Sequence, residues 1–280
     1  MNPASKKPLA DGNCSREPAR GTASTDRLAH DREQARGYKE IFKIRSEILF
    51  EDADLLAVNK PAGLLSVPDR WDKEKENLVE MLQTARPGQQ IANVHRLDRN
   101  TTGVFLLAKT EEAFRRVTLQ FREHQTRKLY LALVHGDIAE QERVIDLPIG
   151  PHPKMVGISR IDEKHGKPAR SIVRVKERFR GYTLIEVEIE SGRQHQVRVH
   201  CQHIGHPLVG DADYGGRPLL LSQIKRKYRL KEGREERPLM DRPALHAASL
   251  TLPVPPVTIT APLPKDLTVA LKYLRMFAVM

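Results

Sequence analysis

The stretch VHRLDRNTTG, residues 94–103, places several charged side chains directly before an apolar run at 104–108. An apolar run of this length predicts a strand buried on both faces, so the charged residues are expected in the loop that leads into it. Asp98 lies between Arg96 and Arg99, and neighbouring cations favour the ionised form of a carboxyl group. An ionised carboxylate can serve as a nucleophile, a general base or a metal ligand, but the same residues also fit a surface salt bridge.

The composition indicates a polyanionic partner. Lys and Arg number 47 against 36 Asp and Glu, which gives a formal net charge of +11. Ribosomal, DNA-binding and membrane-surface proteins share such an excess, so it names a class of partner rather than an activity. The stretch IKRKYRLKEGREERP, residues 224–238, adds a local concentration of seven Lys or Arg.

A second polar stretch is SGRQHQVRVHCQHIGHP, residues 191–207. Its apolar residues recur at helical spacing, and the Gly and Pro near its end are typical of a helix stop, so we predict a helix over 194–204. Arg198 lies off the apolar face of that helix, and Arg193 comes just before it. Such cations, beside the free N–H groups of a helix start, are suited to hold a phosphate or a catalytic carboxylate.

The four histidines of this stretch raise the question of a metal site. Only His200 and His203 share a helical face, and no pair of cysteines completes a ligand set. We therefore predict no metal site, and expect these histidines to be structural or to face a polyanionic ligand.

Tyr130 is a third candidate for a functional residue. It lies in the segment Lys128-Leu129-Tyr130 at the start of a predicted strand. Alternation along a strand places Tyr130 on the face opposite Leu129 and Leu131. If the leucines face the core, the phenol faces a cleft, where it can stack on a base. A core tyrosine is the alternative.

Strands and helices are mixed along the chain without regular alternation, which favours an α+β fold. Residues 1–40 are polar and predicted to be a disordered tail, and 41–280 a single folded domain. The predicted strands are 48–50, 55–58, 104–108, 129–134, 143–147, 171–178, 182–190, 244–252 and 257–260. Along 182–190 the apolar residues Ile185, Val187 and Ile189 alternate with glutamates, which predicts a half-buried strand with one solvated face. The predicted helices are one that Asn77 caps and that runs to about 85, one that follows Thr110 and runs to about 124, and two more at 194–204 and 266–278.

Cysteine usage and the absence of long apolar runs favour a cytoplasmic protein. Only Cys14 and Cys201 are present, so we expect no disulfide framework. No apolar run approaches membrane-spanning length, and the N-terminal residues lack a secretory signal, so no membrane partner is expected.

Several ordered motifs resemble the RluA-type RNA pseudouridine synthases. His95-Arg96-Leu97-Asp98 followed by Thr101-Thr102-Gly103 is similar to the signature of that family. The other matching segments, in the family's order, are NKPAGLLSVP (59–68), KLY (128–130), GRQHQVRVH (192–200), GHPLVGD (205–211) and LHA (245–247). The resemblance spans about 45–262. It implies a pseudouridine synthase fold with a mixed, mostly antiparallel sheet and a central RNA-binding cleft.

The resemblance also implies roles for single residues. Asp98 would attack the target uridine, Tyr130 would stack on the flipped base and help to remove the C5 proton, and Arg198 would pair with Asp98. Arg96 would fill the space that the flipped nucleotide leaves, and His95 and Arg193 are expected among the RNA contacts. No cofactor is implied, and a monomer that needs no protein partner is the default of the family.

The chain departs from the family pattern in one large feature, the basic insertion at 225–237. We expect Lys225, Arg226 and Lys227 to bind RNA, and the alternative is a solvent-exposed loop without a binding role. The segment before the catalytic domain is too short and polar for the S4 RNA-binding domain that many members carry. The chain therefore resembles most the members that modify stem-loops in ribosomal and transfer RNA.

Two other functions remain as alternatives. A glycosidase or nuclease would need a second carboxylate near Asp98, whereas the motifs supply arginines. A non-catalytic RNA-binding protein on the same fold would not need Asp98, Tyr130 and Arg198 together.

Overall fold

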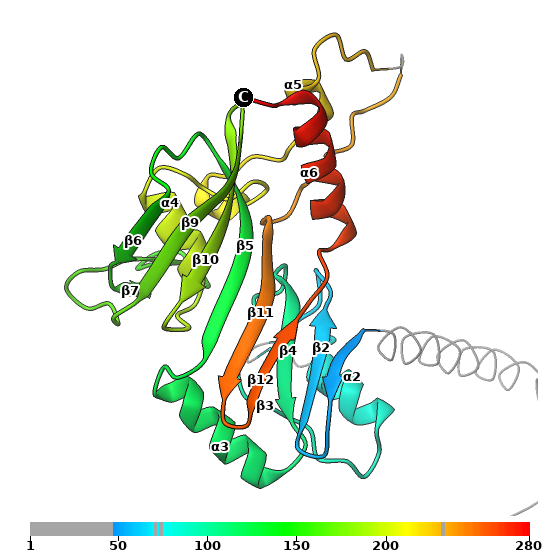
Figure 1. Ribbon diagram of the computed structural model, residues 1–280, viewed down its shortest axis with the longest axis vertical. Coiled ribbons are helices and arrows are strands. Elements are labelled where there is room, and N and C mark those ends of the chain that lie inside the picture. The colour runs from blue at the N-terminus through cyan, green and yellow to red at the C-terminus, as the bar shows by residue number, and fades with distance from the viewer. Residues whose placement is uncertain (1–46, 70–71, 73–74, 231–232) are drawn as a thin grey trace, which may run out of the picture. The chain divides into compact units, whose positions relative to one another are not determined.

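The computed structural model describes residues 47–69, 72, 75–230 and 233–280, and the tail predicted at 1–40 lies outside them. Within the described residues, one sheet of ten strands follows the order β1–β2–β4–β11–β5–β10–β9–β6, with β12 paired to β11 and β3 to β4 (Figure 1). Every pair in it is antiparallel except β4 with β11. The predicted α+β class and mostly antiparallel sheet are confirmed.

The strands of the large sheet are β1 (Ile48–Glu51), β2 (Leu55–Lys60), β3 (Ala92–Asn93), β4 (Thr102–Ala108), β5 (Arg127–His135), β6 (Glu142–Asp146), β9 (Arg170–Phe179), β10 (Tyr182–Ile189), β11 (Leu245–Pro253) and β12 (Pro256–Thr260). A separate hairpin pairs β7 (Ile149–Pro151) with β8 (Ser159–Ile161). The described helices are α2 (Leu78–Ala85), α3 (Glu111–Arg122), α4 (Gln196–His203), the short η1 (Ala212–Tyr214), α5 (Leu221–Ile224) and α6 (Lys265–Phe277).

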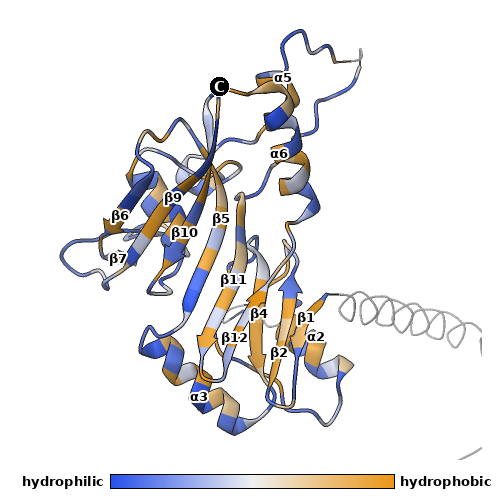
Figure 2. Ribbon diagram, in the orientation of Figure 1, coloured by the Kyte–Doolittle hydropathy of each residue, from blue (hydrophilic) through white to orange (hydrophobic). Residues whose placement is uncertain are grey.

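Strand β4 is buried along its whole length because apolar clusters cover both of its faces. Val104 and Leu106 pack with α3 on one face, while Phe105 and Leu107 pack with α2 on the other. In Figure 2 the neighbouring strands β2 and β4 are hydrophobic almost throughout. The buried strand predicted from the run at 104–108 is confirmed, and the loop that carries Asp98 ends where it begins.

The half of the sheet around β5, β9 and β10 is covered differently on its two faces. Ile185 and Val187 of β10 pack with α4, whereas Leu184 belongs to the cluster under α6. The predicted alternation along β10 is confirmed, because Glu186 and Glu188 are less buried than the residues between them. Strand β10 therefore sets one apolar face against α4, whose first turn borders the site described below.

Capping residues start two of the helices where the sequence predicts. The side chain of Asn77 accepts a hydrogen bond from Glu80 N at the start of α2, and the side chain of Thr110 accepts one from Ala113 N at the start of α3. Such bonds satisfy backbone donors that have no partner within the helix. None of the described helices is long and apolar enough to cross a membrane.

Helix α4 begins two residues later than the sequence predicts, at Gln196. His195 has a left-handed backbone, with φ of 57°, so the chain turns there before the helix starts. The Gln196 side chain stabilises this turn by accepting hydrogen bonds from Ser191 Oγ and Arg193 N. The polar residues 192–195 therefore form a turn and not the first helical residues.

Gly103 fixes the contact between the two parallel strands. Its φ is +111°, and a Cβ atom there would lie 2.1 Å from the carbonyl oxygen of Ala247. Only glycine allows the backbones of β4 and β11 to approach this closely. The approach brings the loop before β4 beside Leu245, the first residue of β11.

Candidate active site

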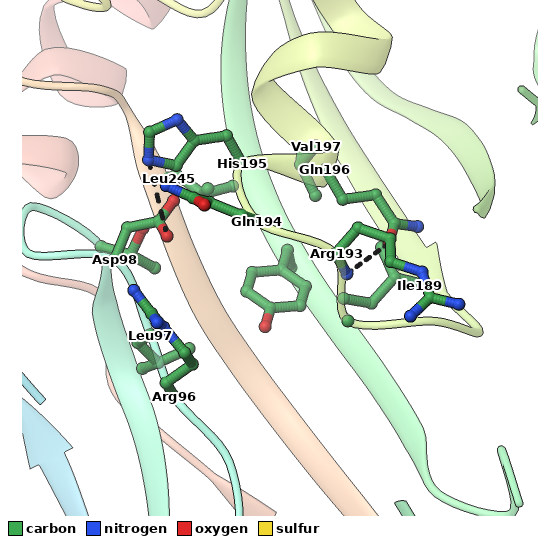
Figure 3. A pocket seen from close by; sticks show the side chains of 13 residues that line it. Arg96, Leu97, Asp98, Ile189, Arg193, Gln194, His195, Gln196, Val197 and Leu245 are labelled. Atoms are coloured by element: carbon green, nitrogen blue, oxygen red, sulfur yellow. Dashed lines mark hydrogen bonds and ion pairs between the residues drawn. The ribbon is translucent and has the colours of Figure 1, made fainter. Parts of the chain in front are cut away.

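An open pocket lies where the loop before β4 meets β5, the start of β11 and the turn before α4. Its volume is about 230 Å³, below the roughly 300–1,000 Å³ of sites for drug-sized ligands and suited to a single base. In Figure 3, the side chains of Asp98 and His195 point toward one another and are joined by a dashed line. The lining residues are Arg96, Leu97, Asp98, Thr101, Tyr130, Ile189, Gly192, Arg193, Gln194, His195, Gln196, Val197 and Leu245.

Buried polar side chains hold the loop that carries Asp98. Ser66 Oγ donates to the carbonyl oxygen of Leu97 at 2.6 Å and accepts from Leu97 N at 3.0 Å. Lys60 Nζ donates to the carbonyl oxygens of Arg99 and Thr101 at 2.9 and 3.0 Å. These contacts fix the backbone on both sides of Asp98.

Arg242 completes the support of the loop from its other end. Its guanidinium donates to the carbonyl oxygen of Asn100 at 3.0 Å, and two further nitrogens bind the carboxylate of Asp266 at 2.7 and 2.9 Å. Asp266 lies in the first turn of α6. Helix α6 is thus connected through Arg242 to the backbone two residues after Asp98.

Lys60 holds the loop that carries Asp98, and the sequence did not single this residue out. Its side chain is fully buried, and burial lowers its pKa to about 7, against the opposing charge of Asp98. A buried lysine is rare unless its donors are satisfied, and three carbonyl oxygens, including that of Pro61, satisfy this one. The signal available in the sequence was a lysine at the end of an apolar strand, in the segment NKPAG.

Two side chains from the α4 region approach the Asp98 carboxylate. Arg198 Nη1 lies 3.9 Å from Asp98 Oδ2, and His195 Nε2 lies 3.9 Å from Asp98 Oδ1. Both distances are within the range of ion pairs and beyond that of hydrogen bonds. The structure therefore brings Arg198 to Asp98, as the sequence predicts, but leaves the carboxylate free to contact a ligand.

Arg198 makes its hydrogen bonds with two aspartates that the sequence did not indicate as its partners. Asp211 binds it through both carboxylate oxygens, at 2.7 and 2.6 Å, and Asp213 adds a third bond at 2.8 Å. The guanidinium also lies over the ring of Tyr214, 4.7 Å from its centroid. Burial alone would lower the pKa of Arg198, but the bonds to the two aspartates and the charge of Asp98 raise it, so the guanidinium is held charged.

His195 is oriented by Tyr214 as well as by Asp98. Its Nδ1 lies 2.8 Å from the hydroxyl of Tyr214, and that hydroxyl accepts a hydrogen bond from Ser159 N. The tyrosine can therefore donate its proton to the imidazole. Burial lowers the pKa of His195, so the ring is mostly neutral near pH 7 despite the charge of Asp98.

Tyr130 forms part of the pocket wall together with apolar residues. Ile189, Val197 and Leu245 line the same cavity, so a planar base would meet an aromatic ring and aliphatic side chains. Burial, and to a lesser degree the charge of Asp98, raise the pKa of Tyr130 well above the usual value. The phenol is neutral at physiological pH and can donate a hydrogen bond.

The remaining predicted RNA contacts separate into those at the pocket and those away from it. Arg96 is exposed and lines the pocket, and its side chain has no partner among the described residues. Arg193 also lines the pocket, and its Nε donates to the carbonyl oxygen of Pro168 at 2.9 Å. Lys225, Arg226 and Lys227 do not line it.

His95 lies in a packing position that differs from the expected RNA contact. Its ring stacks on Phe121 at a centroid distance of 5.1 Å, and its Nε2 accepts a hydrogen bond from Leu106 N at 2.9 Å. Burial lowers its pKa to about 3, and the charge of Lys128 acts in the same direction. The imidazole therefore serves as a neutral acceptor for the backbone of β4, which explains its place beside the loop that carries Asp98.

The described residues contain no group of three or more His, Cys, Asp or Glu arranged to hold a metal. His200 is fully buried, and its two ring nitrogens contact Ser171 Oγ and the carbonyl oxygen of Leu147. This histidine is structural.

Comparison with known proteins identifies similar chains. The family model described as RNA pseudouridylate synthase matches residues 54–203. The ribosomal large subunit pseudouridine synthase D of Pseudomonas aeruginosa is 39% identical over 250 residues, which cover 83% of this chain and 72% of that protein. The protein of the same name from Nitrosomonas europaea is 38% identical, and the match covers 82% of this chain and 65% of that relative.

Solved structures show the same fold. The human RNA pseudouridylate synthase domain containing 4 superposes with a TM-score of 0.66 at 24% identity, covering 86% of this chain and 98% of that one. The human RNA pseudouridylate synthase domain containing 1 gives a TM-score of 0.59 at 27% identity, covering 84% and 96%.

The packing role of His95 predicts a specific pH dependence of stability. Because its pKa is about 3 in the folded chain and about 6.5 in the unfolded chain, the unfolded chain binds the extra proton between these values. The free energy of unfolding should fall as the pH falls through this window, by up to about 1.4 kcal/mol per pH unit. Urea unfolding of His95→Gln should show less of this acid dependence, with the exposed His203→Gln as the control. If the free energy of unfolding of the variant depends on pH as that of the wild type does, and the variant binds RNA more weakly, His95 contacts RNA and the packing role is wrong.

Proposed function

The chain belongs to the RNA pseudouridylate synthase family, and from this premise we propose that it isomerises uridine to pseudouridine in structured RNA. The observation that carries the proposal is the position of Asp98, which lies in a base-sized pocket within ion-pair distance of Arg198 and beside the Tyr130 ring. A partly exposed carboxylate held in this way can attack a nucleotide that enters the pocket.

The proposed reaction needs the target uridine to leave its stack. Flipping a nucleotide costs a few kcal/mol, and the exposed guanidinium of Arg96 at the pocket mouth is placed to take the vacated position. Tyr130 would then stack on the flipped base. The neutral phenol supports stacking and hydrogen-bond donation, whereas removal of the C5 proton by a phenolate would require an ionisation that the buried, negatively charged surroundings oppose.

The isomerisation itself balances without a cofactor. The glycosidic C–N bond breaks, a C–C bond forms at C5 of the base, the proton of C5 is lost and the released nitrogen gains one. Asp98 supplies the nucleophile, whether it attacks the sugar or the base ring. The charged Arg198 stabilises the carboxylate when it is released at the end of the reaction.

We propose ribosomal RNA as the substrate, with transfer RNA as a second class. The support comes from the names of the relatives and from the net charge of +11. A dual-specificity RNA pseudouridine synthase RluA from Vibrio parahaemolyticus is also 38% identical, over 60% of this chain and 69% of that one. We further propose a cytoplasmic protein, since the buried thiol of Cys201 is free, and a monomer, since this is the state expected for the family.

A non-catalytic RNA-binding protein is the second candidate, and the geometry disfavours it. Binding of an anionic ligand is weakened by a carboxylate in the pocket. A protein that only binds RNA does not need a carboxylate at this position. It also does not need Lys60 and Arg242 to hold the loop of Asp98 in place.

Asp98→Asn tests the catalytic assignment. The variant keeps the size of the side chain and removes its nucleophilic oxygen, so the rate should fall by at least about 10³-fold while RNA still binds. Tritium release from RNA that carries [5-³H]uridine, made from unmodified ribosomal and transfer RNA, measures the rate. Asp146→Asn, at an exposed position outside the pocket, is the matched control.

Two results would contradict the proposal at different points. If the wild-type chain releases no tritium from either RNA, the proposed activity is wrong. If Asp98→Asn releases tritium at the wild-type rate, the activity stands and the catalytic assignment is wrong.

Lys60→Met tests whether the support of the loop matters for catalysis. The substitution leaves carbonyl oxygens of the loop without donors, and we expect a loss of stability of about 1–3 kcal/mol and a fall in kcat of about 10–100-fold from misplacement of Asp98. Lys128→Met is the control, because Lys128 is also buried but donates to the carbonyl oxygen of Glu190. A similar kcat for the two variants at similar stability would contradict a positioning role for Lys60.

A further inference from the structure

The chain between Leu219 and Met240 forms a loop that projects from the domain (Figure 1). Leu219 N donates to Met240 O at 2.9 Å, and Leu239 N donates to Leu219 O at 2.7 Å, so the two ends are held side by side. Between them, the described residues 225–230 and 233–237, which we call the basic excursion, extend beyond α5 and α6 (Figure 1). None of the residues that line the pocket comes from this part of the chain.

The root of the basic excursion is firmly attached. Ile224 is only 2% exposed and packs in the apolar cluster under α6, and its carbonyl oxygen accepts a hydrogen bond from Arg180 Nη2. Lys225 follows directly, with its ammonium group 5.2 Å from the ring centroid of Phe277. The cations that come next are therefore presented from a fixed base.

The cations of the basic excursion have no carboxylate partners among the described residues. Elsewhere in the domain several exposed arginines have carboxylate partners, as Arg115 has Glu111 and Arg275 has Glu177. The basic excursion carries six Lys or Arg and two Glu, and Glu236 accepts a hydrogen bond from Ser222 N. The unpaired cations are Lys225, Arg226, Lys227, Arg229, Arg234 and Arg237.

Clustered cations without partners repel one another, and an external polyanion relieves this repulsion. We propose that the basic excursion is a second RNA-binding surface, separate from the pocket, which holds phosphates of the substrate outside the nucleotide that is modified. This inference rests on the proposed function, because it concerns the RNA that the pocket would modify.

The chemistry of the basic excursion fits an RNA backbone better than a membrane surface. A membrane-binding segment needs an apolar face to insert, and the excursion has no described helix and one large exposed apolar side chain, Leu230. An RNA backbone needs only spaced cations, since phosphate contacts carry no sequence information. The surface would therefore add affinity and orientation, while the pocket selects the uridine.

The test replaces Arg226, Lys227 and Arg229 together by Gln and compares two RNA lengths. One RNA is a stem-loop just large enough to present the uridine, and the other carries the same stem-loop within a longer ribosomal RNA fragment. The matched control replaces Arg115, Arg122 and Arg143 by Gln, which removes the same net charge from exposed positions on α3 and β6. All six side chains are exposed, so both variants should fold, and their thermal unfolding is checked first.

We expect the excursion variant to bind the longer RNA more weakly and with less salt dependence. Loss of two or three phosphate contacts should reduce the slope of log Kd against log salt by about 1.5–2.5. KM for the longer RNA should rise, kcat should stay the same, and the stem-loop should be modified as by the wild type. The control variant should lose less of the salt dependence.

Three outcomes would overturn the inference. If log Kd depends on log salt with the same slope in the two variants, the effect comes from net charge alone. If the excursion variant loses as much affinity for the short stem-loop as for the longer RNA, the contact lies at the pocket. Loss of binding to vesicles that contain phosphatidylserine, with unchanged binding of RNA, would assign the surface to membranes. In each case pseudouridine formation by the wild-type chain would persist, whereas its absence would contradict the proposed function instead.

Discussion

Two basic side chains hold three consecutive carbonyl oxygens after Asp98. Lys60 binds those of Arg99 and Thr101, and Arg242 binds that of Asn100. Lys60 is fully buried, so its loss would leave the carbonyl oxygen of the buried Thr101 without a donor where water does not reach it. The backbone around Asp98 is therefore fixed before any ligand arrives, as a site that must position one carboxylate requires.

This constraint connects distant parts of the fold. Lys60 ends β2, Arg242 precedes β11, and Asp266 in α6 orients the guanidinium of Arg242. The close approach at Gly103 completes the arrangement by setting β4 against β11. The neighbouring Arg198 is fixed in a similar way, because Asp211 and Asp213 hold it in place and keep it charged, while its guanidinium stays 3.9 Å from the Asp98 carboxylate.

The sequence predicted those features that depend on local pattern. The charged loop before a buried strand, the alternation along β10 and the caps at Asn77 and Thr110 all follow from spacing and residue type, and the structure agrees. The short strands β7 and β8 and the left-handed turn at His195 were not predicted, because a few residues of mixed polarity carry no periodic signal.

The support of the site could not be predicted in the same way. The bond between Arg198 and Asp211 depends on how α4 packs against the following loop, which no single-sequence pattern encodes. Lys60 was overlooked because lysine is ordinarily exposed, and only the fold shows that its donors are satisfied. His95 was expected to contact RNA because a sequence does not show to which side of a loop a ring turns.

The central claim is that this pocket, through Asp98, makes pseudouridine in cellular RNA. It is tested most directly by mapping pseudouridines in ribosomal and transfer RNA from cells that lack the gene and carry either the wild-type chain or the Asp98→Asn chain, expressed at equal levels. Our account predicts that specific uridines remain unmodified in the deletion, regain pseudouridine with the wild-type chain and stay unmodified with the variant. An unchanged map in the deletion, or full restoration by Asp98→Asn, would contradict it.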